Sequence, residues 1–317
     1  MSEGSIVALT GGGGGAKLCL GLQRVLPAGS LSAIVNTGDD FEHLGLRISP
    51  DLDTILYTLA GLVNPELGWG RRDETWSFMR VLEALGGETW FRLGDGDLAL
   101  HVERTRRLAA GESLSTCTAD VARRMGVSTR ILPMSDDAVR TIVSTPEGEL
   151  GFQDYFVRAR CVPAVHSLRY AGVDAAHMAP GVEQALRDAE LRAIVLTPSN
   201  PFLSIDPILA LPGMRRALRA ARVPIVAVTP IIGDAAVKGP TAKIMTELGL
   251  TPSPLTVAEH YGDLIDGFVF DACDAEIAPR LNLPNRVCDT LMSTLEDRER
   301  VAHYVLEFAA TLHPQHA

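Results

Sequence analysis

The sequence has few cysteines and no long apolar run. Its cysteines are odd in number and at least fifteen residues apart, which argues against a disulfide framework and a zinc knuckle. They are Cys19, Cys117, Cys161, Cys273 and Cys288. No apolar stretch reaches 18 residues, and no basic leader precedes the first apolar run. We therefore expect buried thiols in a reducing compartment and a soluble, cytoplasmic protein without a membrane partner.

Positive charge is also scarce. The chain has 29 Lys and Arg against 39 Asp and Glu, which gives a net charge of −10. A surface of this sign repels phosphate polymers, so a nucleic-acid partner is not expected. An anionic small molecule would need a local site built from backbone amides, a few basic side chains or a metal ion.

The pattern of apolar residues predicts the fold class. Short apolar runs bounded by Gly, Pro, Asn or Asp alternate with longer stretches of helical period. This alternation is typical of an α/β protein with a doubly wound, mainly parallel, Rossmann-like sheet. Strands are expected at Ile6–Leu9, Leu31–Val35, Arg130–Pro133, Ala193–Leu196, Ile225–Val228 and Gly267–Phe270.

Between residues 51 and 124 the strand signals stop and the pattern becomes helical. We interpret 51–124 as a helical insertion over the ligand crevice, with 1–50 and 125–317 as the nucleotide-binding core. All three tryptophans fall in the insertion. They either border the crevice or form the core of a small helical layer.

Five expected strands end in residues suited to ligands, and strand ends of this kind converge on one crevice. The first is Thr10–Lys17, whose five glycines precede a helix. Glycine lets the backbone approach an anion, and the helix start supplies free amides, so Gly12, Gly13, Gly14 and Lys17 are candidates for phosphate binding. The run lacks the end of a P-loop and the acidic residue of a dinucleotide site, and the alternative is a simple tight turn.

Aspartates are concentrated after the second strand, at Asp39 and Asp40, and again at Asp51 and Asp53. Such like charge is costly unless a cation or hydrogen-bond donors offset it, and Mg²⁺ is the natural offset when a diphosphate is present. The alternative is that Asp51 or Asp53 caps the following helix.

The remaining strand ends offer further ligands for a donor. In the third loop Ser135 is suited to phosphate, unless the loop only caps a turn. Ser199 and Asn200 lie between two prolines, in a stiffened loop suited to a base or phosphate, and Gly233 and Lys238 follow the next strand. Either of these last two loops could also be a simple connection that binds no ligand.

No Ser/His/Asp or Cys/His set emerges from the eight histidines, so covalent catalysis has little support. Direct displacement at phosphorus, assisted by a metal and positive groups, needs no protein nucleophile.

Seven motifs in order resemble the 2-phospho-L-lactate transferase family of coenzyme F420 biosynthesis, over about residues 5 to 300. They are the Gly-rich start, Asn36–Asp40, Ser49–Thr54, Arg92–Asp95, Pro133–Asp137, Pro198–Pro201 and Pro230–Gly233. The resemblance implies a magnesium-dependent transferase with a guanosine diphosphate-linked donor. The acceptor would be 7,8-didemethyl-8-hydroxy-5-deazariboflavin (Fo), with GMP released. The three-carbon acid on the donor is phospholactate, phosphoenolpyruvate or 3-phosphoglycerate, and a homodimer is expected.

The family motifs imply acceptor binding by Asp53 and Arg92, with Asp53 either a general base or a positioning group. They imply metal or donor contact at Asp39 and Asp40. We predict that Asp40 is the main carboxylate in metal-assisted donor binding and Asp39 secondary, because an acidic turn repels a diphosphate unless a divalent cation lies between them. The family start has a threonine among its glycines, which this chain lacks. A non-catalytic nucleotide-binding regulator is the alternative function, and an ion pair of Arg92 with Asp95 or Asp97 is the alternative to its acceptor role.

Overall fold

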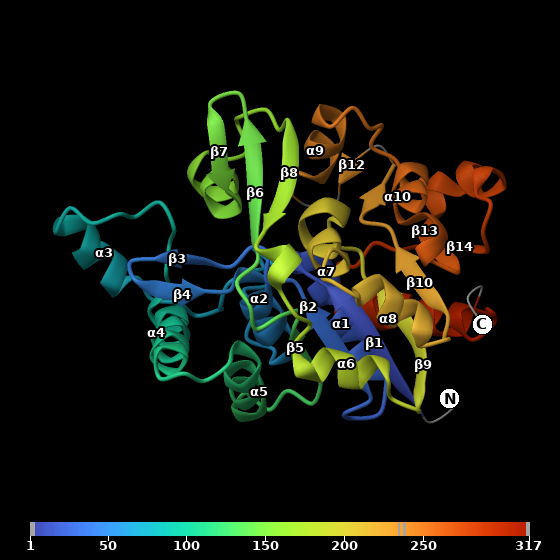
Figure 1. Ribbon diagram of the computed structural model, residues 1–317, viewed down its shortest axis with the longest axis horizontal. Coiled ribbons are helices and arrows are strands. Elements are labelled where there is room, and N and C mark those ends of the chain that lie inside the picture. The colour runs from blue at the N-terminus through green and yellow to red at the C-terminus, as the bar shows by residue number, and fades with distance from the viewer. Residues whose placement is uncertain (1–3, 234, 237–238, 315–317) are drawn as a thin grey trace.

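A seven-stranded, all-parallel sheet forms the centre of the molecule (Figure 1). The structure is a computed structural model that describes residues 4–233, 235–236 and 239–314. Its strand order is β14-β13-β10-β9-β1-β2-β5. The chain first adds strands on one side of β1, out to β5, and then returns to add β9 and the later strands on the other side, so the strand order reverses between β1 and β9. The strands are β1 (Ser5–Thr10), β2 (Leu31–Val35), β5 (Arg130–Pro133), β9 (Leu191–Leu196), β10 (Ile225–Val228), β13 (Gly267–Asp271) and β14 (Asn285–Cys288).

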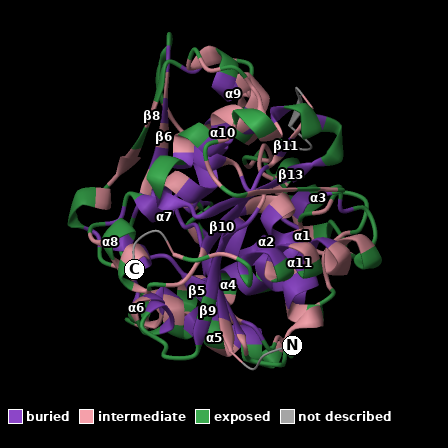
Figure 2. Ribbon diagram, turned by 90° about the vertical axis from the view of Figure 1, so that its right-hand side faces the viewer, coloured by how far each residue is buried: buried purple, intermediate pink, exposed green. Residues whose placement is uncertain are grey.

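Helices cover both faces of this sheet, which confirms the predicted Rossmann-like α/β class. Alternate residues of β1 enter opposite cores: Val7 and Leu9 face one layer, whereas Ile6 and Ala8 face the other. Figure 2 shows the buried strands between these layers. One layer contains α1 (Gly12–Val25), α2 (Pro50–Leu59), α5 (Leu114–Arg124) and α11 (Leu295–Ala309). The other contains α6 (Pro180–Leu186), α7 (Asp206–Leu209), α8 (Met214–Ala220), α9 (Thr241–Glu247) and α10 (Pro254–Tyr261).

A smaller lobe extends from the sheet at the left of Figure 1. Its core is separate and small, built on Ile48, Met79 and Leu93. The lobe contains β3 (Phe41–His43), β4 (Leu46–Ile48), α3 (Ser77–Ala84) and α4 (Asp95–Ala109). Because α2 and α5 share the core of the sheet, the lobe itself consists of the β3–β4 hairpin and the segment between these two helices. The division at residues 51 and 124 stays a prediction.

A three-stranded antiparallel sheet rises beside the central sheet, and we call residues 140–171 the arm (Figure 1). Sequence patterns did not predict it. The amide of Thr141 donates to the carbonyl of Gly38 at 2.7 Å, so the arm is attached to the acidic turn after β2. The arm contains β6 (Arg140–Thr145), β7 (Gly148–Gly151), the π-helix η1 (Asp154–Arg158) and β8 (Ser167–Ala171).

The remaining elements are short connections. They are η2 (Val173–Ala175), η3 (Pro201–Ile205), β11 (Ile231–Ile232), β12 (Ala235–Ala236), η4 (Gly262–Leu264) and η5 (Ala272–Arg280). Within the described ranges, no helix combines the length and apolar character needed to span a bilayer.

Candidate active site

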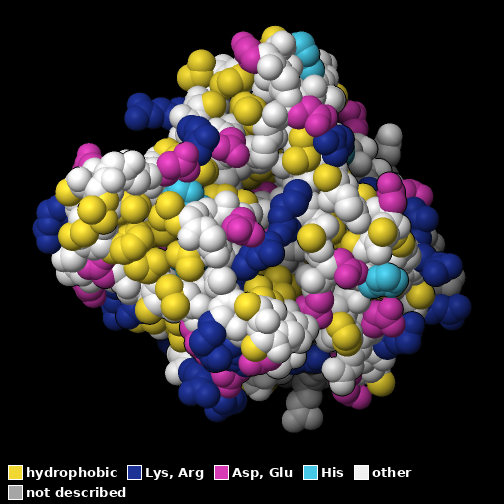
Figure 3. Space-filling view, turned by 60° about the vertical axis from the view of Figure 1, so that its left-hand side comes forward, with side chains coloured by type: hydrophobic (Ala, Val, Ile, Leu, Met, Phe, Trp, Pro, Cys, Tyr) yellow, Lys and Arg dark blue, Asp and Glu magenta, His cyan; other side chains and the backbone are white. Residues whose placement is uncertain are grey.

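A cavity of about 600 Å³ lies at the carboxyl ends of the strands, between the sheet, the lobe and the arm. Figure 3 shows a hollow beside the lobe, on which hydrophobic side chains gather. Four of the five predicted loops line the cavity, after β1, β2, β9 and β10. The fifth, Pro133–Asp137, does not line it. The expected convergence of strand ends is therefore present in four loops of five.

The glycine run forms the start of α1 and part of the cavity wall. Gly12 has a φ of +65°, which favours glycine on conformational grounds alone. Gly14 has no room for a side chain, because a Cβ would collide with the carbonyl of Pro198. A Cβ on Gly13 would lie 3.1 Å from the carbonyl oxygen of Gly68 in the lobe. An α-helix leaves its first-turn amides without intrahelical acceptors, and here no side chain covers these amides beside the cavity because the residues are glycines.

Asp51 caps this helix start from the neighbouring helix α2. Its Oδ1 accepts from the amide of Gly12 at 2.8 Å, and its Oδ2 accepts from Asn36 Nδ2 at 2.9 Å. Burial raises the pKa of Asp51 to about 6 despite these two bonds. Asp51 is thus a helix cap, but of α1. The cap of its own helix α2, which the sequence suggested as the alternative, is not formed by Asp51.

The two aspartates of the acidic turn, Asp39 and Asp40, lie in different surroundings. Asp39 lines the cavity, and its buried Oδ1 has no hydrogen-bond partner among the described residues. Burial and then the charge of Asp51 raise the pKa of Asp39 well above its ordinary value. Asp40 does not line the cavity; its Oδ2 accepts from Ser49 Oγ at 2.8 Å. Burial raises the pKa of Asp40 to about 7, although the charge of Arg140 opposes the shift.

Besides the glycines, three predicted donor ligands lie at the cavity. Ser199 Oγ accepts from the amide of Gly11 at 3.1 Å, which joins the loop after β9 to the glycine run. Asn200 lines the cavity, while its Oδ1 caps η3 by accepting from the amide of Phe202. Lys17 also lines the cavity, and its ammonium donates to the carbonyl of Met292 at 2.7 Å.

The other predicted donor ligands lie elsewhere. Ser135 is buried beneath the surface and donates to the carbonyl of His177 at 2.6 Å, outside the cavity lining. Gly233 is also outside the lining, and its amide donates to Asp274 at 2.9 Å. The predicted donor ligand Lys238 lies outside the described residues.

The two predicted acceptor residues line the same cavity although they are far apart in sequence. Asp53 lies on α2, and Arg92 lies in the lobe, with its guanidinium 4.2 Å from the centre of the Trp76 ring. The alternative ion pairs of Arg92 are not formed in the described part of the chain. Asp95 caps α3 through the amide of Phe78, and Asp97 accepts from Tyr57.

Sequence reasoning missed the partners of Asp53. Both terminal nitrogens of the Arg104 guanidinium, Nη1 and Nη2, donate to its carboxylate, and His101 Nδ1 lies 3.7 Å from Asp53 Oδ2. Asp53, Asp97 and His101 also bring three possible metal-ligand atoms within 4.8 Å of one another. Because Arg104 already places a positive charge on both Asp53 oxygens, we interpret this group as a hydrogen-bonded network and not as an ion site. The i, i+4, i+7 spacing of Asp97, His101 and Arg104 was the available signal.

Aromatic rings line both sides of the cavity. On the lobe, the Phe91 ring packs edge-on against Phe41, with ring centres 4.8 Å apart. On the arm, Phe152 and Phe156 are stacked at 5.3 Å, and both line the cavity. Arg158 bridges the two sides, with its guanidinium 4.4 Å from the centre of the Trp90 ring. The cavity thus joins a polar end at the glycine run to an apolar slot suited to a flat ring.

Known proteins are similar to this chain over nearly its whole length. Residues 6–302 match the family described as 2-phospho-L-lactate transferase CofD. The chain belongs to this family. A phosphoenolpyruvate transferase of Streptomyces avermitilis is 42% identical over 96% of this chain and 97% of its own. A 2-phospho-L-lactate transferase of Methanosarcina mazei is 39% identical over 95% of this chain and 99% of its own.

Membership of the 2-phospho-L-lactate transferase family makes the chain a transferase of coenzyme F420 biosynthesis, as its motifs predicted. The fold is also found in a solved structure of a UPF0052-family protein from Bacillus halodurans. That structure aligns with a TM-score of 0.64 and 15% identity over 96% of this chain and 99% of its own. It supports the fold alone. The relatives give no support to a non-catalytic regulator.

Proposed function

We propose that this chain transfers a phosphate-linked three-carbon acid from a guanosine diphosphate-linked donor to the terminal ribityl hydroxyl of Fo. The observation that carries the proposal is one cavity lined by both the glycine run and the Asp53–Arg92 pair. Two substrates that must react with each other need adjoining sites, and both sets of residues border the same 600 Å³.

The donor fits the polar end of the cavity. The positive end of α1 and its bare first-turn amides suit a diphosphate, and Lys17 adds a positive charge near that end. Thr241, to which Asn200 Nδ2 donates at 3.0 Å, adds a polar side chain to the same end. These groups supply the local positive potential that a chain of net charge −10 lacks as a whole.

The acceptor fits the other end. The slot between Phe91 and Phe156 suits the deazaflavin ring, while Arg92 suits its anionic oxygen and Asp53 accepts from a ribityl hydroxyl. In the reaction, the hydroxyl oxygen bonds to the phosphorus that carries the three-carbon acid. The bond from that phosphorus to the bridging oxygen breaks, its electron pair stays on that oxygen as part of the GMP phosphate, and the hydroxyl proton passes to water or to the leaving GMP phosphate. The product is a phosphodiester, and GMP is released.

Mg²⁺ fits the acidic turn. Asp39 presents a buried carboxylate oxygen without a partner among the described residues, next to the charge of Asp51. Carboxylate oxygens are the ligands that Mg²⁺ prefers, and a diphosphate approaching this turn meets repulsion without a cation. We propose that Asp39 coordinates the ion and that Asp40, which does not line the cavity, adds negative charge beside Asp39. A bound Mg²⁺ would neutralise charge on the transferred phosphate.

A mass-spectrometric assay tests the proposal. Purified protein is mixed with Fo, GTP, Mg²⁺, a guanylyltransferase that forms the donor, and each three-carbon phosphate in turn. We expect a product with the mass of Fo plus the phospho-acid, together with GMP. The mass also identifies which acid this chain transfers. Absence of any Fo adduct with all three acids, while GDP still binds, would remove the transferase reaction and leave only nucleotide binding.

A further inference from the structure

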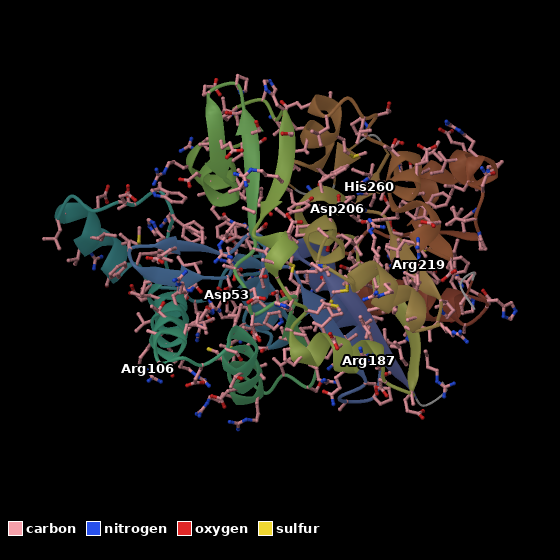
Figure 4. The ribbon with its side chains drawn as sticks, viewed as in Figure 1. Asp53, Arg106, Arg187, Asp206, Arg219 and His260 are labelled. Atoms are coloured by element: carbon pink, nitrogen blue, oxygen red, sulfur yellow. The ribbon has the colours of Figure 1, made fainter. Side chains whose placement is uncertain are left out.

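Two helices face each other at the acceptor end through five polar side chains. Asp53 and Tyr57 are four residues apart on α2, and they meet Asp97, His101 and Arg104 on α4. These three α4 residues share one face of their helix, since their spacing is four and then three. In Figure 4 Asp53 lies in the interior, whereas the labelled Arg106 lies on the outer side of α4.

Arg104 is the centre of this group and is unusually buried for an arginine, with 2% of its side chain exposed. It binds Asp53 at two points, with Nη1 at 3.2 Å from Oδ2 and Nη2 on Oδ1. Its Nη1 also lies 3.4 Å from His101 Nδ1. Because a guanidinium only donates, Nδ1 accepts here, which places the proton of a neutral His101 on Nε2.

His101 Nε2 lies 3.3 Å from Asp97 Oδ2 but has no hydrogen-bond partner among the described residues, and Tyr57 donates to the other oxygen of Asp97 at 2.6 Å. Hydrogen bonds therefore join Tyr57 to Asp97, and Arg104 to both His101 and Asp53, while the two parts are in close contact between Asp97 and His101. The end that remains open is Asp53, whose other lone pairs border the cavity.

We propose that Arg104 is a positioning residue for the transfer reaction, which it serves by fixing the orientation of the Asp53 carboxylate toward the acceptor hydroxyl. This inference rests on the proposed function. A two-point contact from a planar guanidinium fixes both the position and the rotation of a carboxylate, which a lysine ammonium cannot do. Asp53 then acts by orienting the hydroxyl, because a proton moved onto it would disrupt a bond to Arg104.

The chain offers a matched control on the same helix. Arg107 follows Arg104 by three residues and is also largely buried, with 11% of its side chain exposed. It binds Glu112 at 2.6 Å and Asp120 at 2.8 Å, and it does not line the cavity. Loss of Arg107 thus removes a semi-buried ion-pair network of α4 without touching Asp53.

A double-mutant cycle tests the proposal. The variants are Arg104→Gln, Asp53→Asn, their combination, and Arg107→Gln as the control. For each we would measure the KM for Fo, kcat, the Kd for GDP and the thermal midpoint. We expect Arg104→Gln to raise the KM for Fo about tenfold or more, with the Kd for GDP within about twofold. In the Asp53→Asn background the same change should add less than about twofold, because its effect passes through Asp53.

The control and the conservative variant separate positioning from simple support of the fold. Arg107→Gln should lower the thermal midpoint and leave the KM for Fo unchanged. Arg104→Lys, which keeps the buried charge, replaces Arg104→Gln in the cycle if the latter does not fold; its KM should lie between those of the wild type and Asp53→Asn.

Two outcomes would overturn the proposal. One is a folded Arg104 variant with unchanged KM for Fo, and the other is full additivity of the Arg104 and Asp53 changes. Both outcomes count only if the wild-type protein binds Fo and catalyses the transfer. A wild type that binds GDP but neither binds Fo nor turns over would instead refute the proposed function, and the positioning role would fall with it.

Discussion

Replacing Asp40 by Asn should stabilise the ligand-free protein at neutral and higher pH. Asp40 is buried, accepts from Ser49 Oγ and has a pKa raised from 3.8 to about 7 because burial disfavours its charge. In the unfolded chain the group ionises near its ordinary value. Between these two values the folded protein holds a proton that the unfolded chain releases.

The sign of the pH dependence follows from this difference. Folding takes up a proton, so the contribution is fully present below pH 3.8 and is lost as the pH rises through about 7. A difference of about three pKa units corresponds to about 4 kcal/mol, a large share of an ordinary unfolding free energy. Asp51, with a pKa of about 6, and Asp39 act in the same direction. An Asn at position 40 has the same shape, can still accept from Ser49 and has no charge to bury.

Urea denaturation at pH 4 to 8, in the presence of a chelator, measures the effect. We expect Asp40→Asn to equal the wild type near pH 4 and to exceed its unfolding free energy by up to about 4 kcal/mol at pH 8. Asp136→Asn is the control, because this exposed carboxylate caps α5 by accepting from the amide of Ser115 at 2.7 Å. It should not stabilise the protein at any pH. An Asp40→Asn variant less stable than the wild type at pH 8 would refute the reasoning.

The same variant tests the proposed catalytic role of Asp40: Asp40→Asn should lose most turnover although the protein becomes more stable, which is the usual exchange of stability for function. Arg92→Ala should weaken Fo binding about tenfold to a hundredfold and leave GDP binding intact in separate titrations; unchanged Fo affinity would exclude it from the acceptor site. Asp39→Asn should raise the Mg²⁺ concentration needed for half-maximal activity, and an unaltered Mg²⁺ dependence contradicts the proposed ion site. Phe156→Ala should raise the KM for Fo several-fold, about 1 kcal/mol, whereas Val162→Ala on the same arm should not.

Strong apolar periodicity made the central sheet predictable. Strands such as Leu31–Val35 and Ile225–Val228 are buried on both faces and read as continuous apolar runs. The edge strand Asn285–Cys288 escaped prediction because only one side of it pairs and it begins with two polar residues, which leaves no apolar run. The arm escaped for a related reason: β8 has no fully buried residue, so its sequence lacks the contrast between faces that marks a strand.

For the site, sequence order identified residues at strand ends but not their surroundings. Asp53 and Arg92 border one cavity, yet no pattern showed that Arg104 binds Asp53, because that contact depends on how α4 packs against α2. Ser135 shows the opposite case. Its loop has the composition of a ligand loop, but the chain directs its hydroxyl to His177, a contact 42 residues away that local sequence does not encode.

The glycine run that begins α1 is the meeting point of several distant segments, and this has a consequence for how the sequence can drift. The carbonyl of Pro198 blocks a side chain on Gly14, and that of Gly68 crowds one on Gly13. A relative with a larger residue at either position needs a compensating shift in the opposing segment. Both opposing atoms belong to the backbone, so no change of side chain at position 198 or 68 can make room. Positions 13 and 14 are therefore expected to stay glycine wherever the opposing segments keep their course, and a single replacement there should disturb two distant parts of the chain at once.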